Sequence, residues 1–150
     1  VTRMANVRLN GIEVVDGIGE FASTKLNLFL ESSAGTIVML TSGLQTIWSQ
    51  CVVTALMGLV GNGDLDSSFV LDTWKGTSKM RPCFAAIRSG DVKMTDQLTY
   101  DTLADARSDR NREKTVELMR DYVGMIKGAL TGGPVEETVV TVDEAAAELF

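Results

Sequence analysis

Two short segments have residue spacings that could bind a cofactor or a metal. Residues 17–22 (GIGEFA) match the GxGxxA pattern, in which backbone N–H groups hold a pyrophosphate between a strand and a helix. Residues 62–66 (NGDLD) alternate oxygen-bearing side chains as a calcium loop does, but Thr73 stands where such a loop needs a bidentate Glu. The residues after Ala22 favour a strand. We therefore expect a glycine turn and a helix cap, and we predict no cofactor or metal site.

A third segment, residues 75–93, places cations beside aromatic side chains. It has five bases and the single acid Asp91, whereas the whole chain has 20 acids, 14 bases and a net charge of −6. The five bases are Lys75, Lys79, Arg81, Arg88 and Lys93. Because cations near Trp74 and Phe84 could grip phosphates and stack bases, we predict a contact for nucleic acid or another anion there. The alternative is that these charges are solvated beside two core aromatics.

The remaining residues contain no recognisable catalytic constellation. The chain has no histidine, which removes the commonest general base and the commonest metal ligand. No GxSxG elbow and no P-loop occur in the sequence. We therefore predict a non-enzymatic protein, and the alternative is a small histidine-free enzyme that relies on Lys, Asp or Glu. The negative net charge also argues against a general nucleic-acid binder.

The longest uncharged stretch of the chain lies between Glu31 and Asp64, where 32 consecutive residues carry no charge. Since 23% of all residues are charged, about seven would be expected in a stretch of this length. Such a stretch should be covered, either by the core of the chain itself or by another subunit. At helical spacing most of its apolar residues form one core face, but Val53, Met57 and Val60 lie on the far side. We predict that these three residues contact a neighbouring subunit.

Residues 5–41 are predicted to form strands. The Asn-Gly pair at residues 10–11 lies between two apolar runs, which is the strongest short-range signal for a β-hairpin turn. Leucines alternate with other residues through positions 26–30, as in a strand that is buried on one face. We expect a second hairpin across residues 32–35. A helix over residues 20–30 is the alternative.

Residues 43–130 are predicted to be mainly helical. A helix over residues 43–60, capped by Ser42 or Thr41, should end at the Gly-Asn-Gly of residues 61–63. A short helix over residues 64–75 follows. An extended piece, Cys83 to Arg88, then comes before the next helical region.

That next helical region, residues 95–130, should begin at a cap on Thr95 or Asp96 and carries a row of acids. The acids recur every four residues: Asp101, Asp105, Asp109, Glu113, Glu117 and Asp121. This spacing exceeds the helical turn of about 3.6 residues, so the row winds around the helix. The helix is therefore predicted either to break near Ser108 or to change partners there. The row is either a solvated face or a docking surface for a partner or a cation.

The C-terminal residues 134–150 form an acidic tail. Five acids and no base follow Lys127 in the sequence. Within the tail we predict a strand over residues 138–142 and a final helix over residues 144–150. In a head-to-tail assembly, this tail could meet the basic segment of the next subunit, and deletion of residues 135–150 should then reduce the size of the oligomer.

The order of elements predicts an α+β fold in a single domain over residues 1–150, because strands come first and helices follow. Two cysteines without CxxC spacing favour buried, reduced thiols, and the N-terminus has no signal-peptide pattern. A reducing compartment or a virion is therefore favoured. The uncharged helix is too short and too polar for a good membrane span, so no membrane partner is predicted.

The leading functional hypothesis is a structural subunit of a homo-oligomeric or filamentous assembly, such as a virion or phage component. It depends on the uncharged stretch, on the opposed basic and acidic segments and on the missing catalytic constellation. The predicted partner is then the protein itself. A monomeric adaptor or ligand-binding module is the alternative from a different class.

Overall fold

The computed structural model describes residues 2–18, 23–76, 83–130 and 139–142. It confirms the α+β class. In chain order the elements are β1 (Thr2–Ile18), β2 (Ser23–Glu31), β3 (Ile37–Gly43), α1 (Ile47–Asn62), β4 (Phe69–Lys75), β5 (Cys83–Ser89), β6 (Val92–Lys93), α2 (Gln97–Ser108), α3 (Arg112–Ala129) and β7 (Val139–Val142).

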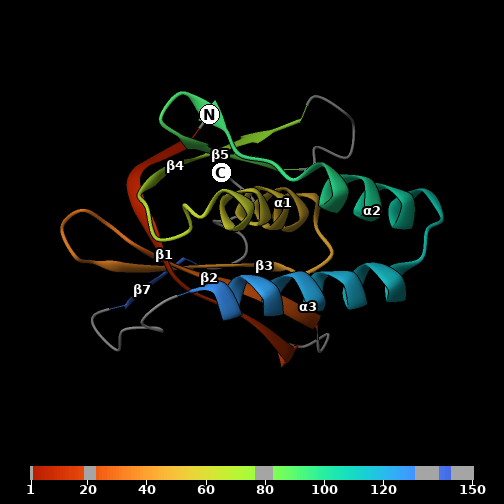
Figure 1. Ribbon diagram of the computed structural model, residues 1–150. Coiled ribbons are helices and arrows are strands. Elements are labelled where there is room, and N and C mark those ends of the chain that lie inside the picture. The colour runs from red at the N-terminus through yellow and green to blue at the C-terminus, as the bar shows by residue number, and fades with distance from the viewer. Residues whose placement is uncertain (1, 19–22, 77–82, 131–138, 143–150) are drawn as a thin grey trace.

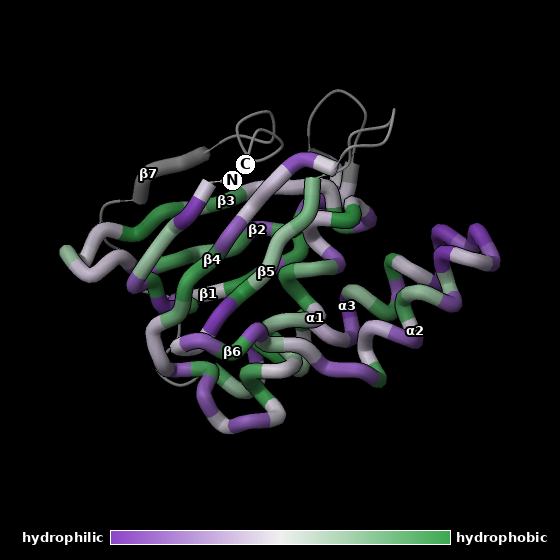
Figure 2. The backbone as a smooth tube through the Cα atoms, turned by 90° about the horizontal axis from the view of Figure 1, so that it is seen from above, coloured by the Kyte–Doolittle hydropathy of each residue, from purple (hydrophilic) through white to green (hydrophobic). Residues whose placement is uncertain are grey.

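The described strands form one seven-stranded sheet in the order β6-β5-β4-β1-β2-β3-β7, and only the β3–β7 pair among them is parallel. The strands lie on one side of the molecule and the three helices on the other (Figure 1, Figure 2). Strand β1 is shared by two halves of the sheet, because its first residues pair with β4 and its later residues pair with β2.

The predicted hairpin at Asn10-Gly11 is wrong. Strand β1 runs through these residues without turning, and its register with β2 shifts between Leu9 and Gly11, as at a β-bulge. A hairpin there would have paired two runs of only three residues. The continuous strand instead has two neighbours and buries Val7, Leu9 and Ile12 in the core.

The alternating leucines of β2 confirm the strand prediction, and the alternative helix over residues 20–30 is wrong. Leu26, Leu28 and Leu30 are all fully buried and lie on the face that the helices cover. The hairpin across residues 32–35 is also confirmed, with Gly35 at φ 85°, a conformation that favours glycine.

Helix α1 covers the centre of the sheet. Its N-cap is Thr46, whose hydroxyl accepts a hydrogen bond from the Ser49 amide, rather than the predicted Ser42 or Thr41. Its end at Gly63 is as predicted, because Gly63 adopts the left-handed conformation with φ 73°. One turn earlier, Gly58 packs directly on the backbone of Thr95, where an added Cβ would lie 2.6 Å from the carbonyl oxygen.

Residues 43–130 are less helical than predicted. The helix expected over residues 64–75 is wrong, because Phe69–Lys75 form strand β4 between β1 and β5. This segment is rich in aromatic and β-branched residues, and pairing on both sides decides its conformation. The extended piece predicted from Cys83 is confirmed as β5.

The predicted break near Ser108 is confirmed. Helix α2 ends at Ser108 and α3 begins at Arg112, with Asn111 as the N-cap of α3. The hydrophilic residues of this junction lie at the end of the helix pair that is farthest from the sheet (Figure 2). Asp96 caps α2, which is one of the two residues expected there.

Strand β7 confirms the strand predicted near residues 138–142, and it pairs with β3 at the edge of the sheet. The predicted break at residues 131–134 and the predicted helix over residues 144–150 lie outside the described residues. Most of the acidic tail lies outside them as well.

Candidate functional site

A cavity of about 310 Å³ lies between α1, α2 and β5. Its walls combine aromatic and apolar residues with a few polar groups, as is typical of small-molecule sites. The aromatic and apolar residues include Trp74, Phe84, Met94, Tyr100 and Leu103, and the cationic residues are Lys93 and Arg107. We call this space the ring cavity.

Two aromatic side chains of the ring cavity stack on each other. Trp74 and Phe84 are direct partners across the β4–β5 pair, with ring centroids 6.1 Å apart and ring planes inclined by 23°. Both side chains are only partly buried. They therefore present an apolar, flat wall on which a further ring could pack.

Gln50 and Arg107 join α1 to α2 at the boundary of the ring cavity. Gln50 is only 3% exposed, and its Nε2 donates a hydrogen bond of 2.9 Å to the carbonyl oxygen of Gln45. The guanidinium of Arg107 donates to Oε1 of the same Gln50 side chain. Gln50 is thus held at both ends, and it fixes the position of the Arg107 side chain.

A second, more open cavity of about 950 Å³ lies on the other side of this contact. It shares Ile47, Gln50 and Arg107 with the ring cavity. Four of its lining residues are cations: Lys25, Arg107, Arg110 and Arg112. No acid lines either space among the described residues, although acids outnumber bases in the chain. We call this space the cationic cavity.

Of the five bases predicted to contact an anion, the structure places one at the ring cavity. Lys93 lines it, whereas Lys75 is exposed at the end of β4. Arg88 lies 3.7 Å from the carboxylate of Asp72. Lys79 and Arg81 lie outside the described residues. The aromatic pair that accompanied these bases in the sequence does line the ring cavity.

Sequence reasoning missed the three arginines of the cationic cavity. Arg107, Arg110 and Arg112 lie in a run of alternating charges around the α2–α3 junction, which is typical of a solvated helix end. Only the fold brings this junction beside Lys25 of β2. The one available signal was the density of arginine in that run.

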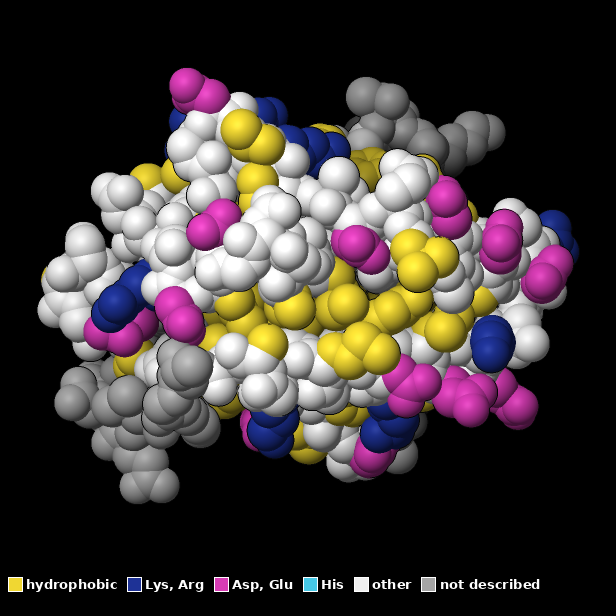
Figure 3. Space-filling model, in the orientation of Figure 1, with side chains coloured by type: hydrophobic (Ala, Val, Ile, Leu, Met, Phe, Trp, Pro, Cys, Tyr) yellow, Lys and Arg dark blue, Asp and Glu magenta, His cyan; other side chains and the backbone are white. Residues whose placement is uncertain are grey.

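Several apolar side chains remain partly or largely exposed on the three helices, and we call six of them the apolar band. They are Met57 and Val60 of α1, Leu98 of α2, and Leu118, Tyr122 and Met125 of α3. Figure 3 shows hydrophobic side chains gathered across the middle of this face, where Figure 1 draws α3 below α1 and α2. Leu98 is 75% exposed and Met125 is 54% exposed, so the band is open to solvent.

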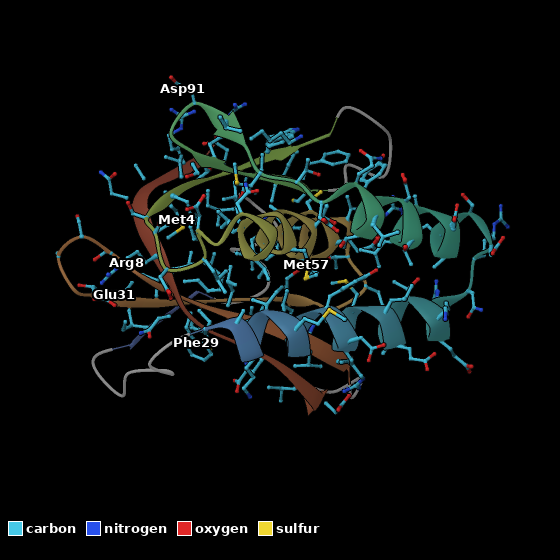
Figure 4. All side chains as sticks on the ribbon, viewed as in Figure 1. Met4, Arg8, Phe29, Glu31, Met57 and Asp91 are labelled. Carbon is cyan, nitrogen blue, oxygen red and sulfur yellow. The ribbon has the colours of Figure 1, made fainter. Side chains whose placement is uncertain are left out.

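The three residues predicted to meet a neighbouring subunit have different environments. Val53 is fully buried in the main core, so it is not available to a partner. The reason is that α3 packs on this side of α1 and covers it with its own buried residues, including Met119. Met57 and Val60 stay partly exposed. Met57 lies between the ribbons of α1 and α3 (Figure 4).

Acidic side chains flank the apolar band. Asp101 and Asp105 are exposed on α2 within seven residues of Leu98, and Asp121 is exposed one turn before Met125 on α3. Figure 3 shows acids above and below the hydrophobic side chains. The acidic row predicted from the sequence thus contributes members to both edges of the band.

A different surface, the tip of the β5–β6 hairpin, combines an exposed apolar residue with two cations and one acid. The β5–β6 hairpin ends in a tight turn with Gly90 and Asp91, and Val92 beside it is 61% exposed. Arg88 and Lys93 are partners across the hairpin and are both exposed. Asp91 marks this hairpin tip in Figure 4, away from the apolar band.

Two carboxylates outside the cavities have a lowered pKa. A hydrogen bond from Arg3 lowers the pKa of Asp72, with Nε of Arg3 2.7 Å from Oδ1 of Asp72. A hydrogen bond from Arg120 lowers the pKa of Asp16. Asp72 is buried, whereas Asp16 is exposed, so the first pair matters more for stability.

Neither Cys51 nor Cys83 forms a disulfide, and both are half-buried rather than fully buried. Within the described part of the chain, no cluster of three or more metal-ligating residues occurs. The same residues contain no helix that combines the length and the apolar character of a membrane span. The strand that follows residues 17–22 is not the helix a dinucleotide loop needs.

Comparison with known proteins returned no match. No family model, no curated protein and no solved structure matches this chain.

Proposed function

We propose that this protein is a non-enzymatic structural subunit that associates head to tail with copies of itself in a ring or filament, for example in a virion or phage particle. The supporting observation is the apolar band with its acidic flanks on one surface, together with the cationic hairpin tip on another. Contiguous exposed apolar side chains on a soluble domain mark sites of interaction.

A second copy is the occupant that the charges favour. The band offers apolar side chains between Asp101, Asp105 and Asp121, and the hairpin tip offers Val92 near the cations Arg88 and Lys93 and the single acid Asp91. Opposite charges around apolar contacts favour association and fix the register of the partners. Both halves of the complementary pair are present on the same chain.

The geometry of the proposed contact predicts its symmetry. An interface between two different surfaces is heterologous, and it repeats until a ring closes or a filament grows. A face-to-face contact of two bands would instead form a closed dimer and would bring like charges together. We therefore expect oligomers larger than a dimer.

Light scattering after size exclusion tests this assembly, with negative-stain microscopy to show its form. The wild-type protein should be larger than the 16.2 kDa monomer at micromolar concentration. Leu98→Asp damages the band and Val92→Asp damages the hairpin tip, so each variant alone should be monomeric. An equimolar mixture should form a dimer, because each variant retains one intact surface. Ala34→Asp, in an exposed turn between β2 and β3, is the matched control.

Three results would contradict the proposal. A monomeric wild-type protein would remove self-association altogether. An oligomer that persists in Val92→Asp but not in Leu98→Asp would show a face-to-face contact of the bands. Dissociation by Ala34→Asp would show that any added charge is enough to disrupt the assembly.

A further inference from the structure

We infer that the ring cavity and the cationic cavity together bind an aromatic phosphate of the nucleotide type, with the ring in the first and the phosphate in the second. The inference does not rest on the proposed assembly, although Lys93 lines the ring cavity and also belongs to the hairpin tip. The residues Tyr100, Leu103 and Arg107 that α2 contributes to the ring cavity follow helical spacing along one side of the helix. At about 100° per residue, Leu98 of the apolar band lies on the opposite side of α2.

The ring cavity has the size and the walls that a planar ring needs. Its volume of about 310 Å³ is at the lower end of the range for ligand pockets, about 300–1,000 Å³. Trp74 and Phe84 already stack on each other, and Tyr100 lines the same space while remaining 53% exposed. Aromatic side chains bind nucleic-acid bases by stacking of this kind.

The cationic cavity supplies the partners that a phosphate needs. Three guanidinium groups and one ammonium line it, and none of its described lining residues is an acid. Arginine donates two parallel hydrogen bonds to phosphate oxygens, and such charge-assisted bonds are stronger than neutral ones.

Arg107 connects the two parts of the site. It lines both cavities, and its contact with the buried Gln50 holds the guanidinium at their boundary. A ligand with its ring against Trp74 would therefore direct its phosphate past Arg107 towards Arg110 and Arg112. The two moieties must be joined by a short linker, as ribose joins a base to its phosphate.

The two tryptophans provide a direct readout with an internal control. Trp74 lines the ring cavity, whereas Trp48 is buried and its indole Nε1 donates a hydrogen bond of 3.1 Å to Thr73. In a ¹H–¹⁵N spectrum each indole gives its own signal. Titration with adenosine 5′-monophosphate should move the Trp74 signal to saturation and leave the Trp48 signal in place.

Two smaller molecules test the contributions of the ring and of the phosphate separately. Adenosine lacks the phosphate and ribose 5-phosphate lacks the ring, so each should bind at least about tenfold more weakly than the intact nucleotide. A 5′-phosphorylated oligodeoxyadenylate of four residues then distinguishes the source of the ligand. If it binds more tightly than the mononucleotide, the ligand is the end of a single strand. If it binds more weakly, the ligand is a free nucleotide.

Two variants test the assigned residues. Arg112→Gln removes a cation that lines the cationic cavity but not the ring cavity, and Arg107→Gln removes the cation that lines both. Each variant should bind the nucleotide about tenfold more weakly. Lys114→Gln makes the same change of charge on the exposed side of α3 and should have no effect. An unmoved Trp48 signal in every variant verifies that the fold is intact.

The inference is overturned if the Trp74 signal does not move to saturation with the nucleotide. It is also overturned if adenosine binds as tightly as the nucleotide, because the cations would then have no role. If Lys114→Gln and Arg112→Gln weaken nucleotide binding equally, the effect comes from net charge alone. That result would also overturn the assignment of Arg112 to the site.

Discussion

The two sides of helix α2 carry similar side chains but offer different surfaces. On one side, Leu98 extends into solvent beside Asp101 and Asp105, as part of the apolar band. On the other, Tyr100 and Arg107 line a concave space that contains cations and no described acid. The presence of a leucine or a tyrosine does not by itself show whether the side chain belongs to an open surface or to a cavity.

Shape and charge together distinguish the kind of partner that each side fits. A convex apolar surface with charged edges matches another protein surface, which can cover it over a wide area. A cavity of limited volume matches a small molecule, because it can surround most of the surface of such a ligand. The net charge of the chain would have suggested neither the acid-free cavity nor its arginines.

The largest loss of stability is expected when a buried side chain of α2 is truncated. Leu103 is 1% exposed in the core, and Leu103→Ala should lower the free energy of unfolding by about 2–5 kcal/mol. Leu98→Ala, on the exposed side of the same helix, should change it by less than about 0.5 kcal/mol. Urea denaturation measures both values. Similar losses for the two variants would contradict the contrast between a buried and an exposed side.

A smaller loss of stability is expected from a substitution in α1 that would displace Thr95, in the segment just before α2. An alanine Cβ at position 58 would lie 2.6 Å from the backbone oxygen of Thr95, so Gly58→Ala should cost about 1–3 kcal/mol. Gly61→Ala in the same helix meets open space and should instead stabilise the protein by about 0.5–1 kcal/mol. Thermal unfolding of the two variants gives opposite shifts of Tm. If both destabilise, the close approach at Gly58 is not the cause.

The smallest loss of stability is expected for Asp72, which lies on the face of the sheet away from α1. Thr73 faces α1, so the adjacent Asp72 points to the other face, where Arg3 lowers its pKa. The unfolded chain then binds a proton more readily than the folded one, so stability should fall as the pH drops below about 4, through the folded pKa. Asp72→Asn should cost about 1 kcal/mol at neutral pH, because Arg3 is largely exposed. Unfolding curves at several pH values should show a weaker loss in acid for this variant than for the wild type.

The regular parts of the fold could be predicted from the sequence, and the exceptions have specific causes. The leucines of β2 alternate strictly, so their strand and its buried face follow from the pattern alone. The Asn-Gly pair of β1 is a turn signal that pairing with β2 overrides. Strand β4 was predicted as a helix because one of its pairing partners, β1, is distant in the sequence.

The candidate site could be predicted only in part. Trp74, Phe84 and Lys93 were singled out because cations and aromatics are close together in the sequence there. Arg107 and Arg112 could not be assigned, because a helix junction full of charge has no periodicity that indicates what lies beside it. Val53 was misassigned because the sequence does not show that α3 folds back over α1.

Strand β1 couples the two halves of the molecule. Its 17 residues pair with β4 at one end and with β2 at the other, so neither half of the sheet can open fully without disturbing the strand they share. Unfolding should therefore be a single cooperative event, and the central amides of β1 should be among the last to exchange their hydrogens with solvent. A mechanical force applied to β4 would accordingly be transmitted through the sheet to β2 by β1.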